Sequence, residues 1–187
     1  MPTRAGVKAL ARYARAGVRV RLFTNSFAAS DVPLVHSGYA HRRKPLLRRG
    51  VEIWEYAPDA ETHRPGSELF AHRLRGIAPF SRNKLHAKVF AVDRSRIFIG
   101  SFNFDPRSMR LNTELGIVLE APHLAEVITE SFEHFVPERA WRVDLTESGA
   151  LRWTRPGEAP RLREPGTTFG ARLALAIAQR LPIEWML

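Results

Sequence analysis

Strand-like and helix-like segments alternate along the 187 residues of this chain. In the helical segments apolar side chains recur at three- and four-residue intervals, while residues 18–23 alternate strictly with Arg19 and Arg21. We predict strands at 18–23, 51–56, 85–92, 96–99, 114–119, 143–145 and 151–153, and helices at 4–16, from Asp31 toward Lys44, at 124–135 and after Thr168. This alternation favours an α/β fold in which helices flank a mixed β-sheet.

Prolines and glycines divide these segments. Pro45 is expected to kink or split the second predicted helix, and Pro137 to end the third. Asp105-Pro106 is typical of the cap and first turn of a short helix. Residues 57–82 have little periodicity and predict a long loop, a kind of segment that often carries function.

One face of the last predicted helix is apolar. Phe169, Leu173, Ala176 and Ile177 share that face. Because the face is rich in alanine and the polar side carries few charges, we expect it to pack in the core instead of anchoring at a membrane surface.

Composition excludes several classes of protein. The chain has no cysteine, which rules out disulfides, thiolate zinc sites, iron–sulfur clusters and a cysteine nucleophile. No stretch approaches the roughly 20 apolar residues of a membrane-spanning helix. The first twenty residues carry a cation every few positions and lack the apolar region of a secretory signal. We therefore expect a soluble or peripheral protein.

The formal net charge of +10 favours partners rich in phosphate, either a nucleic acid or an anionic lipid surface. Nearly all the cations are arginine, an imbalance that genomic base composition alone can produce. The run Arg42-Arg43-Lys44 is more typical of a solvated helix face than of a binding patch.

Polar side chains gather at two neighbouring predicted strands. His86 and Lys88 are two residues apart, so on a strand their side chains leave the same face. Ser101 and Asn103 have the same spacing after the next strand and follow Gly100, which permits a close backbone approach. An imidazole, an ammonium, a hydroxyl and an amide on one face suit a phosphoryl group. We expect no metal, because the only nearby acids are Asp93, Asp105 and Glu114.

These residues match the signature of the phospholipase D superfamily, His-x-Lys, four residues, Asp, six residues, then Gly-Ser-x-Asn. The six fixed positions are His86, Lys88, Asp93, Gly100, Ser101 and Asn103. At roughly 5% usage per residue type, a chance match in a chain of this length is on the order of a few in a million. The segments Thr24-Asn25-Ser26, Val32-Pro33 and Gly50-Val51-Glu52 also resemble the second half of bacterial two-motif members, particularly the cardiolipin synthase type.

The resemblance implies roles for each motif residue. His86 would be the general acid, or in a homodimer either the nucleophile or the acid, and Glu114 would orient its imidazole. Lys88, Ser101 and Asn103 would bind the substrate phosphate, whereas Asp93 and Gly100 would be structural. No cofactor is implied. Tyr39, Arg43 and Lys44 either line the site or, as we favour, belong to an exposed helix.

Members of this type build one active site from two motifs, but His-x-Lys occurs once in this chain. The chain also opens almost directly into a helix where the family has a buried strand. We expect the carboxy-terminal half of a phospholipase D-type phosphatidyltransferase that acts through a phosphohistidine. The alternatives are a homodimeric single-motif phosphodiesterase or nuclease and a catalytically incomplete fragment.

The resemblance also implies an organisation and a location. Residues 1–160 would form the catalytic half-domain, and residues 161–187 a helical tail packed on it. The expected partners are a phosphatidylglycerol-like phospholipid at an anionic membrane surface and a second motif-bearing half, with nucleic acid as second choice. The expected location is the cytoplasm, peripheral to the inner membrane.

Overall fold

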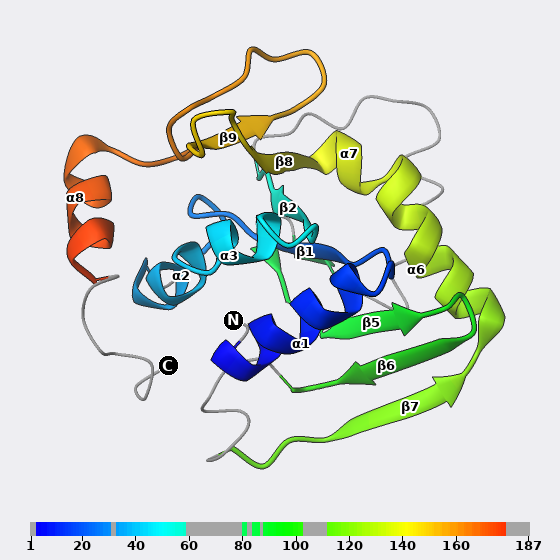
Figure 1. Ribbon diagram of the computed structural model, residues 1–187. Helices are drawn as coiled ribbons and strands as arrows, with labels where there is room; N and C mark the ends of the chain where they lie inside the picture. Colours follow the sequence, from blue (N-terminus) through cyan, green and yellow to red (C-terminus); the bar gives the residue numbers. More distant parts are fainter. Residues whose placement is uncertain are drawn as a thin grey trace.

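The structure is a computed structural model that describes residues 3–30, 33–58, 80–81, 84–86, 88–102 and 112–178 (Figure 1). The helices are α1 (Arg4–Arg15), α2 (Pro33–Ala40), α3 (Arg43–Leu47), α6 (Pro122–His134), α7 (Val136–Arg139) and α8 (Phe169–Ala178). The strands are β1 (Arg21–Asn25), β2 (Glu52–Tyr56), β3 (Phe80–Ser81), β4 (Lys84–Leu85), β5 (Val89–Val92), β6 (Arg96–Gly100), β7 (Gly116–Glu120), β8 (Ala140–Leu145) and β9 (Leu151–Thr154). The predicted α/β class is confirmed.

Two sheets contain most of the described strands. The first has the order β1-β2-β8-β9, in which β1 and β2 are parallel and the other pairs antiparallel. The second, β5-β6-β7, is antiparallel throughout, and β3 pairs with β4. The first sheet is mixed, as predicted, but in the described residues the strands are divided between separate sheets.

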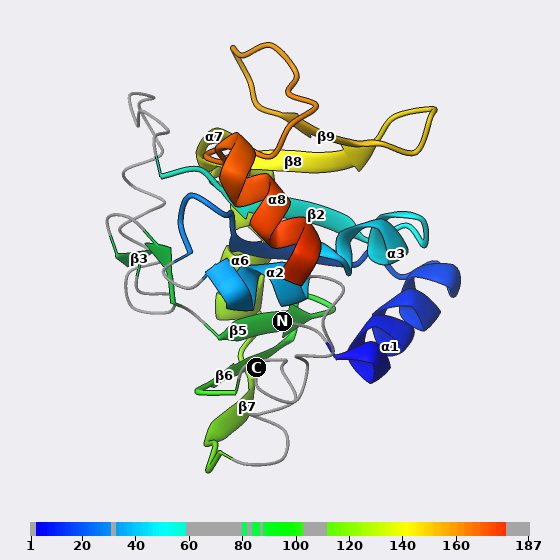
Figure 2. The ribbon, with the colours of Figure 1, turned by 90° about the vertical axis from the view of Figure 1, so that its left-hand side faces the viewer.

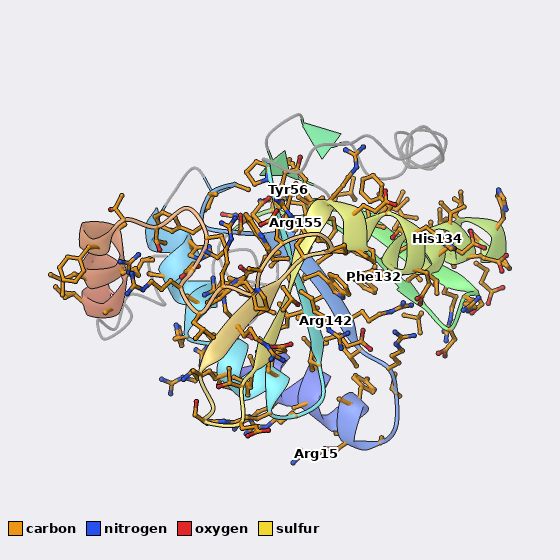
Figure 3. All side chains as sticks on the ribbon, turned by 90° about the horizontal axis from the view of Figure 1, so that it is seen from above. Arg15, Tyr56, Phe132, His134, Arg142 and Arg155 are labelled. Carbon is orange, nitrogen blue, oxygen red and sulfur yellow. The ribbon has the colours of Figure 1, made fainter. Side chains whose placement is uncertain are left out.

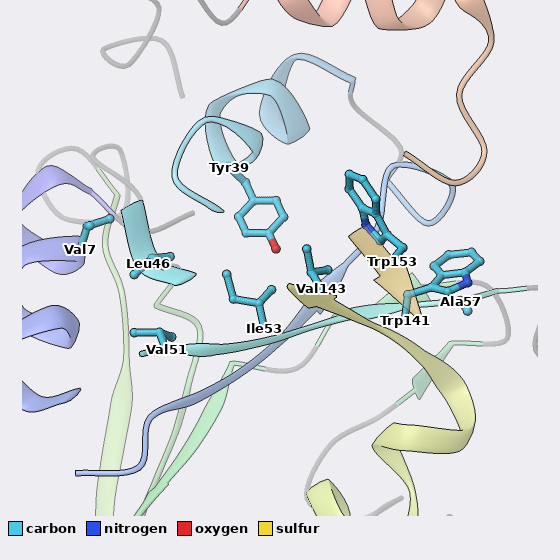
Figure 4. Packing of buried hydrophobic residues seen from close by; sticks show 9 residues of the cluster. All are labelled: Val7, Tyr39, Leu46, Val51, Ile53, Ala57, Trp141, Val143 and Trp153. Atoms are coloured by element: carbon cyan, nitrogen blue, oxygen red, sulfur yellow. The ribbon is translucent and has the colours of Figure 1, made fainter. Parts of the chain in front are cut away.

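Helices α1, α2 and α3 cover one face of the first sheet and enclose the larger hydrophobic cluster (Figure 4). Its buried members are Val7, Tyr39, Leu46, Val51, Ile53, Ala57, Trp141, Val143 and Trp153. Because side chains alternate along a strand, Ile53 points into this cluster and the neighbouring Trp54 points to the opposite face.

A second cluster joins the two sheets on that opposite face. Val127 of α6 and Phe135 are almost completely buried there. They pack with Trp54 of the first sheet and with Val89 and Ile99 of the second. Helix α6 therefore holds the β5-β6-β7 sheet against the rest of the molecule, and Figure 1 shows it rising from the right-hand end of that sheet toward α7.

Helix α1 forms where its periodicity predicts. The hydroxyl of Thr3 caps it by accepting a hydrogen bond of 3.0 Å from the Gly6 N–H, an interaction worth about 1 kcal/mol. Val7 and Ala11 are its buried residues. The helix is followed by Gly17 at φ 86°, a left-handed conformation that glycine adopts without steric cost.

Most of the predicted strands form, but not all of them begin and end at the predicted residues. The first strand begins at Arg21 instead of Val18, and the strands predicted at 143–145 and 151–153 are confirmed as the antiparallel pair β8 and β9. The continuous strand predicted over 85–92 is wrong, because β4 ends at Leu85 and β5 begins at Val89.

The prediction for Pro45 needs correction. The chain breaks between α2 and α3 at His41 and Arg42, and Pro45 lies inside the first turn of α3. The helix predicted to end before Pro137 does so, because α6 ends at His134, and Pro137 lies in the first turn of the next helix, α7. In a first turn the absent proline N–H needs no partner, so the ring is accommodated. Asp31, Asp105-Pro106 and most of the loop predicted over 57–82 lie outside the described residues.

The core prediction for α8 is wrong. Thr168 caps the helix as expected, accepting a 3.2 Å hydrogen bond from the Ala171 N–H. Phe169, Leu173 and Ile177, however, are exposed, because α8 packs on α2 through its other side. Among the described helices, none combines the length and apolar character that crossing a bilayer requires.

Candidate active site

Four motif residues, His86, Lys88, Gly100 and Ser101, lie at one end of the β5-β6-β7 sheet. The Gly100 N–H donates to the Lys88 carbonyl at 3.2 Å, and the Ser101 N–H donates to the Leu115 carbonyl at 2.8 Å. These backbone bonds continue the ladder beyond β5 and β7. They place the segment around His86, the end of β6 and the segment before β7 side by side.

His86 and Lys88 meet although neither belongs to a strand. Lys88 Nζ lies 3.0 Å from His86 Nε2, and the His86 ring is exposed. An ammonium has no acceptor, so Nζ is the donor and Nε2 accepts through its lone pair. In this contact the ring proton is placed on Nδ1, and Nε2 is the ring atom that faces the ammonium.

Ser101 and Glu114 form the second polar pair. Ser101 Oγ donates to Glu114 Oε2 at 2.5 Å and accepts from the Leu115 N–H at 3.1 Å. The amide of Asn112 donates to the other carboxylate oxygen of Glu114 at 3.4 Å. In the described residues the His86 imidazole contacts Lys88, so the orienting role of Glu114 toward it stays a prediction.

Two glycines allow β6 and β7 to approach closely here. Gly100 pairs with Gly116, and the ring of Phe98 covers both. A Cβ on Gly100 would lie 2.6 Å from the Leu115 carbonyl oxygen, and one on Gly116 would lie 2.2 Å from the Phe98 ring. A side chain at Gly100 would therefore force the strands apart beside the motif, and one at Gly116 would displace the Phe98 ring.

Asp93 lies at the opposite end of the hairpin from the histidine. Asp93 and Arg94 have φ values of 51° and 52°, and the Ser95 N–H donates to the Val92 carbonyl at 3.1 Å. Two central residues with positive φ are typical of a type I′ turn, which suits the twist of a β-hairpin. Asp93 is thus a turn residue. Asn103 lies outside the described residues.

Asn25 contacts the residue that precedes His86, an interaction that the sequence did not predict. Its side-chain amide donates to the Leu85 carbonyl at 2.8 Å, and its Oδ1 accepts from the Leu85 N–H at 2.7 Å. This side chain therefore pairs with backbone as a strand would. The local signals in the sequence are its place at the end of β1 and the resemblance of Thr24-Asn25-Ser26 to the family.

Tyr39 and Arg43, which we expected on an exposed helix, are buried. Arg43 is 1% exposed and its Nε lies 2.7 Å from Oε1 of Glu55, which is fully buried. Tyr39 Oη and Trp153 Nε1 each donate to Glu55 at 2.9 Å. The run of cations is therefore not a solvated helix face at Arg43. Neither Tyr39 nor Arg43 lies at the end of the sheet that carries the motif.

Glu164 completes this buried cluster from the C-terminal region. Its carboxylate pairs with Arg43, and its Oε1 lies 2.5 Å from His36 Nε2. Burial raises the pKa of Glu164, but the hydrogen bond with His36 and the charge of Arg43 outweigh it and bring the pKa to about 2. Burial likewise raises the pKa of Tyr39, and the charge of Glu55 raises it further.

Over the residues that the structure describes, no three His, Asp or Glu side chains converge to hold a metal ion. The motif end instead offers an imidazole, an ammonium, a hydroxyl and a carboxylate. This set can bind an anionic oxygen and move a proton without a Lewis acid.

Residues 1–136 match the family model described as "Cardiolipin synthase, PLD-like domain", in which PLD stands for phospholipase D. The chain belongs to this family. Cardiolipin synthase C of Escherichia coli strain K12 is 44% identical over 190 residues, which cover 100% of the chain and 39% of that relative. Cardiolipin synthase B of the same strain is 26% identical over 145 residues, 78% of the chain and 29% of the relative. The chain thus spans well under half of either cardiolipin synthase.

Among solved structures, the chain is similar to the crystal structure of a phospholipase D family member, Nuc from Salmonella typhimurium. That similarity covers 73% of the chain and 90% of the crystal structure's chain, with a TM-score of 0.39 and 16% identity. The phospholipase D resemblance stated from the motif is confirmed by the family match.

Proposed function

We propose that the chain supplies one half of a phospholipase D-type active site that transfers a phosphatidyl group, as in cardiolipin synthesis. The observation that carries the proposal is the His86–Lys88 contact at the end of the sheet, in a chain 44% identical to a cardiolipin synthase. An imidazole nitrogen suits attack on phosphorus or transfer of a proton, and the ammonium beside it suits a phosphate oxygen.

In the proposed reaction, one imidazole Nε2 attacks phosphorus and the P–O bond to the leaving alcohol breaks. A second imidazole gives that alcohol its proton, and a phosphohistidine remains. The acceptor hydroxyl of another lipid then attacks phosphorus, loses its proton to the second imidazole and releases the first. Lys88, Ser101 and Asn103 hold the phosphate oxygens. Whether His86 attacks or protonates depends on its partner half.

The second imidazole must come from another motif, because His-x-Lys occurs once in this sequence. We propose a second phospholipase D half as the partner and an anionic phospholipid as the substrate, at the cytoplasmic surface of the inner membrane. Residues 1–160 act as the catalytic half and residues 161–187 as a tail, which Glu164 ties to the core.

The test is conversion of phosphatidylglycerol to cardiolipin by a preparation that contains both halves, with chelator present. We expect cardiolipin and glycerol, and loss of both products in His86→Ala. A turnover that persists in His86→Ala, or cleavage of nucleic acid with no lipid product, contradicts the proposal.

A homodimeric phosphodiesterase is the second candidate, favoured by the single motif and the net charge of +10. It predicts that the purified chain alone is dimeric and releases nitrophenol from a generic phosphodiester. A monomer in light scattering with no such release rules this candidate out and leaves the two-half enzyme.

A further inference from the structure

Helix α8 presents an apolar stripe to solvent. Phe169 is 77% exposed, Leu173 56% and Ile177 54%, and their spacing places them on one side of the helix. Leu162, in the segment that leads to the helix, is 66% exposed. Exposed large apolar side chains are common singly, but a stripe of this kind marks a surface that binds something apolar.

The stripe does not result from a loosely held helix. Leu175, on the other side of α8, is 5% exposed, and α8 packs on α2. Glu164, just before the helix, is bound by Arg43 and His36 in the interior. Gly166 approaches Ala28 so closely that a Cβ would lie 2.7 Å from the alanine methyl. The helix is therefore held with its apolar stripe outward.

Positive charge lies beside the stripe. Arg163 is exposed, and within the described residues its guanidinium has no carboxylate partner. Arg172 donates to the Thr167 carbonyl and hydroxyl, both neutral groups, so its charge is also not balanced by a described acid. These arginines line an open hollow of about 450 Å³ at the start of α8.

We propose that α8 and the segment before it dock the protein on an anionic phospholipid surface. The three apolar side chains enter the interface between headgroups and acyl chains, and Arg163 and Arg172 bind lipid phosphates. A membrane explains both features, because a protein partner for the stripe alone needs no adjacent cations. The inference rests on the proposed function for the class of lipid, and the tests below separate the two.

The position of α8 agrees with this role. In Figure 1, α8 lies at the left of the molecule, and the motif ends of β5, β6 and β7 also point left. Figure 2, which views that side, shows α8 in front of α2 and above the β5-β6-β7 sheet. A bilayer on this side would face the end of the sheet that carries His86 and Lys88.

The first experiment measures partition of the full chain onto vesicles of phosphatidylcholine with and without phosphatidylglycerol. We expect binding to the anionic vesicles. The triple variant Phe169→Ala, Leu173→Ala, Ile177→Ala should bind about a hundredfold more weakly, because side chains that insert are lost. Arg163→Gln with Arg172→Gln should weaken binding about thirtyfold, at roughly fivefold per arginine.

A matched control removes two charges elsewhere. Arg12→Gln with Arg15→Gln lowers the net charge equally on α1, away from α8, where Figure 3 labels Arg15. This variant should bind nearly as well as the wild type. An equal loss from both arginine pairs would show that net charge alone drives binding and would overturn the proposal. His86→Ala should bind vesicles normally, so a failure of the proposed chemistry leaves this result intact.

The second experiment uses the absence of native cysteine. Leu173→Cys, labelled with an environment-sensitive fluorophore, should report solvent in buffer and an apolar setting with anionic vesicles. Tyr13→Cys, at another exposed apolar position, should report solvent throughout. A label at position 173 that is already shielded in buffer and unchanged by vesicles would mean that residues 179–187 or a second copy cover the stripe. That outcome overturns the proposal.

Discussion

The cluster around Arg43 and the motif end of the β5-β6-β7 sheet contain the same kinds of side chain in opposite settings. Both hold a histidine, a cation and a carboxylate. Arg43 and Glu55 are enclosed by the core, whereas His86 is exposed and Lys88 half-buried. The sequence motif lies in the exposed group at the end of the sheet, which we call the open group. The denser polar network lies in the buried cluster around Arg43, which we call the closed cluster.

The difference lies in what the charges can still bind. In the closed cluster each oxygen of Glu55 already has a partner, so these groups hold packing and cannot receive a substrate. At the exposed end of the sheet the Lys88 ammonium contacts the His86 imidazole, which solvent reaches. A phosphate can replace this contact. The closed cluster should therefore govern stability and the open pair activity.

Arg43→Met gives the largest expected effect on the closed side. It leaves Glu55 and Glu164 buried without their cation, so unfolding free energy should fall by about 3–5 kcal/mol. Chemical denaturation measures this, with Arg48→Met on the exposed side of the same region as control. An Arg43→Met protein as stable as the control would mean that the cluster contributes no net stability.

Glu164→Gln tests how the carboxylate of Glu164 contributes to the stability of the same cluster as the pH changes. The folded pKa of Glu164, about 2, lies below its ordinary value of 4.5, so its charge stabilises the fold above about pH 4.5. That stability, about 3 kcal/mol, is lost as pH falls from 4.5 toward 2. The wild type should exceed Glu164→Gln by this amount at pH 7 and converge with it near pH 2. Glu147→Gln, an exposed site, should show no such gap at any pH.

Lys88→Ala tests whether the exposed His86–Lys88 pair governs activity. We expect turnover by the assembled enzyme to fall about a hundredfold, because a cation that stabilises the phosphorane charge is lost. The melting temperature should stay within a degree or two of wild type, since the pair is solvent-exposed. Lys44→Ala supplies the matched control. A large drop in melting temperature for Lys88→Ala would break the division between the two regions.

Asn25→Ala should have the smallest effect. Loss of its two hydrogen bonds to Leu85 should lower stability by about 1–2 kcal/mol. Because His86 would then be less firmly positioned, kcat should fall several-fold with little change in KM. Asn25→Asp keeps the acceptor for the Leu85 N–H and should recover part of kcat; no difference between these variants would argue against a positioning role.

Local pattern predicted much of the fold. Helix α1 and the strands β8 and β9 follow from the spacing of apolar residues within short windows. The continuous strand predicted over 85–92 was wrong, because β-propensity does not show where the backbone stops pairing with a neighbouring strand. In the structure β4 pairs with β3, whereas β5 pairs with β6, so the two segments belong to different sheets.

The candidate site was predicted because its residues lie within one short stretch of sequence. The buried cluster was missed because its members come from positions 36, 39, 43, 55, 153 and 164, and nothing local links them. From its local sequence Arg43 is predicted to be a surface cation. In the fold Glu55 and Glu164, which are distant in the sequence, lie next to it. Burial of a charge depends on distant counter-charges, which a window of sequence does not contain.

The family, the motif from His86 to Asn103 and the α/β class follow from the order of the amino acids alone. The burial of Arg43 and the outward orientation of the apolar stripe of α8 follow from the packing of the folded chain. Periodicity shows which side chains share a face of a helix, because that depends on backbone geometry alone. Whether another element covers that face depends on packing between segments far apart in the chain, and for α8 the covered side is the one that meets α2.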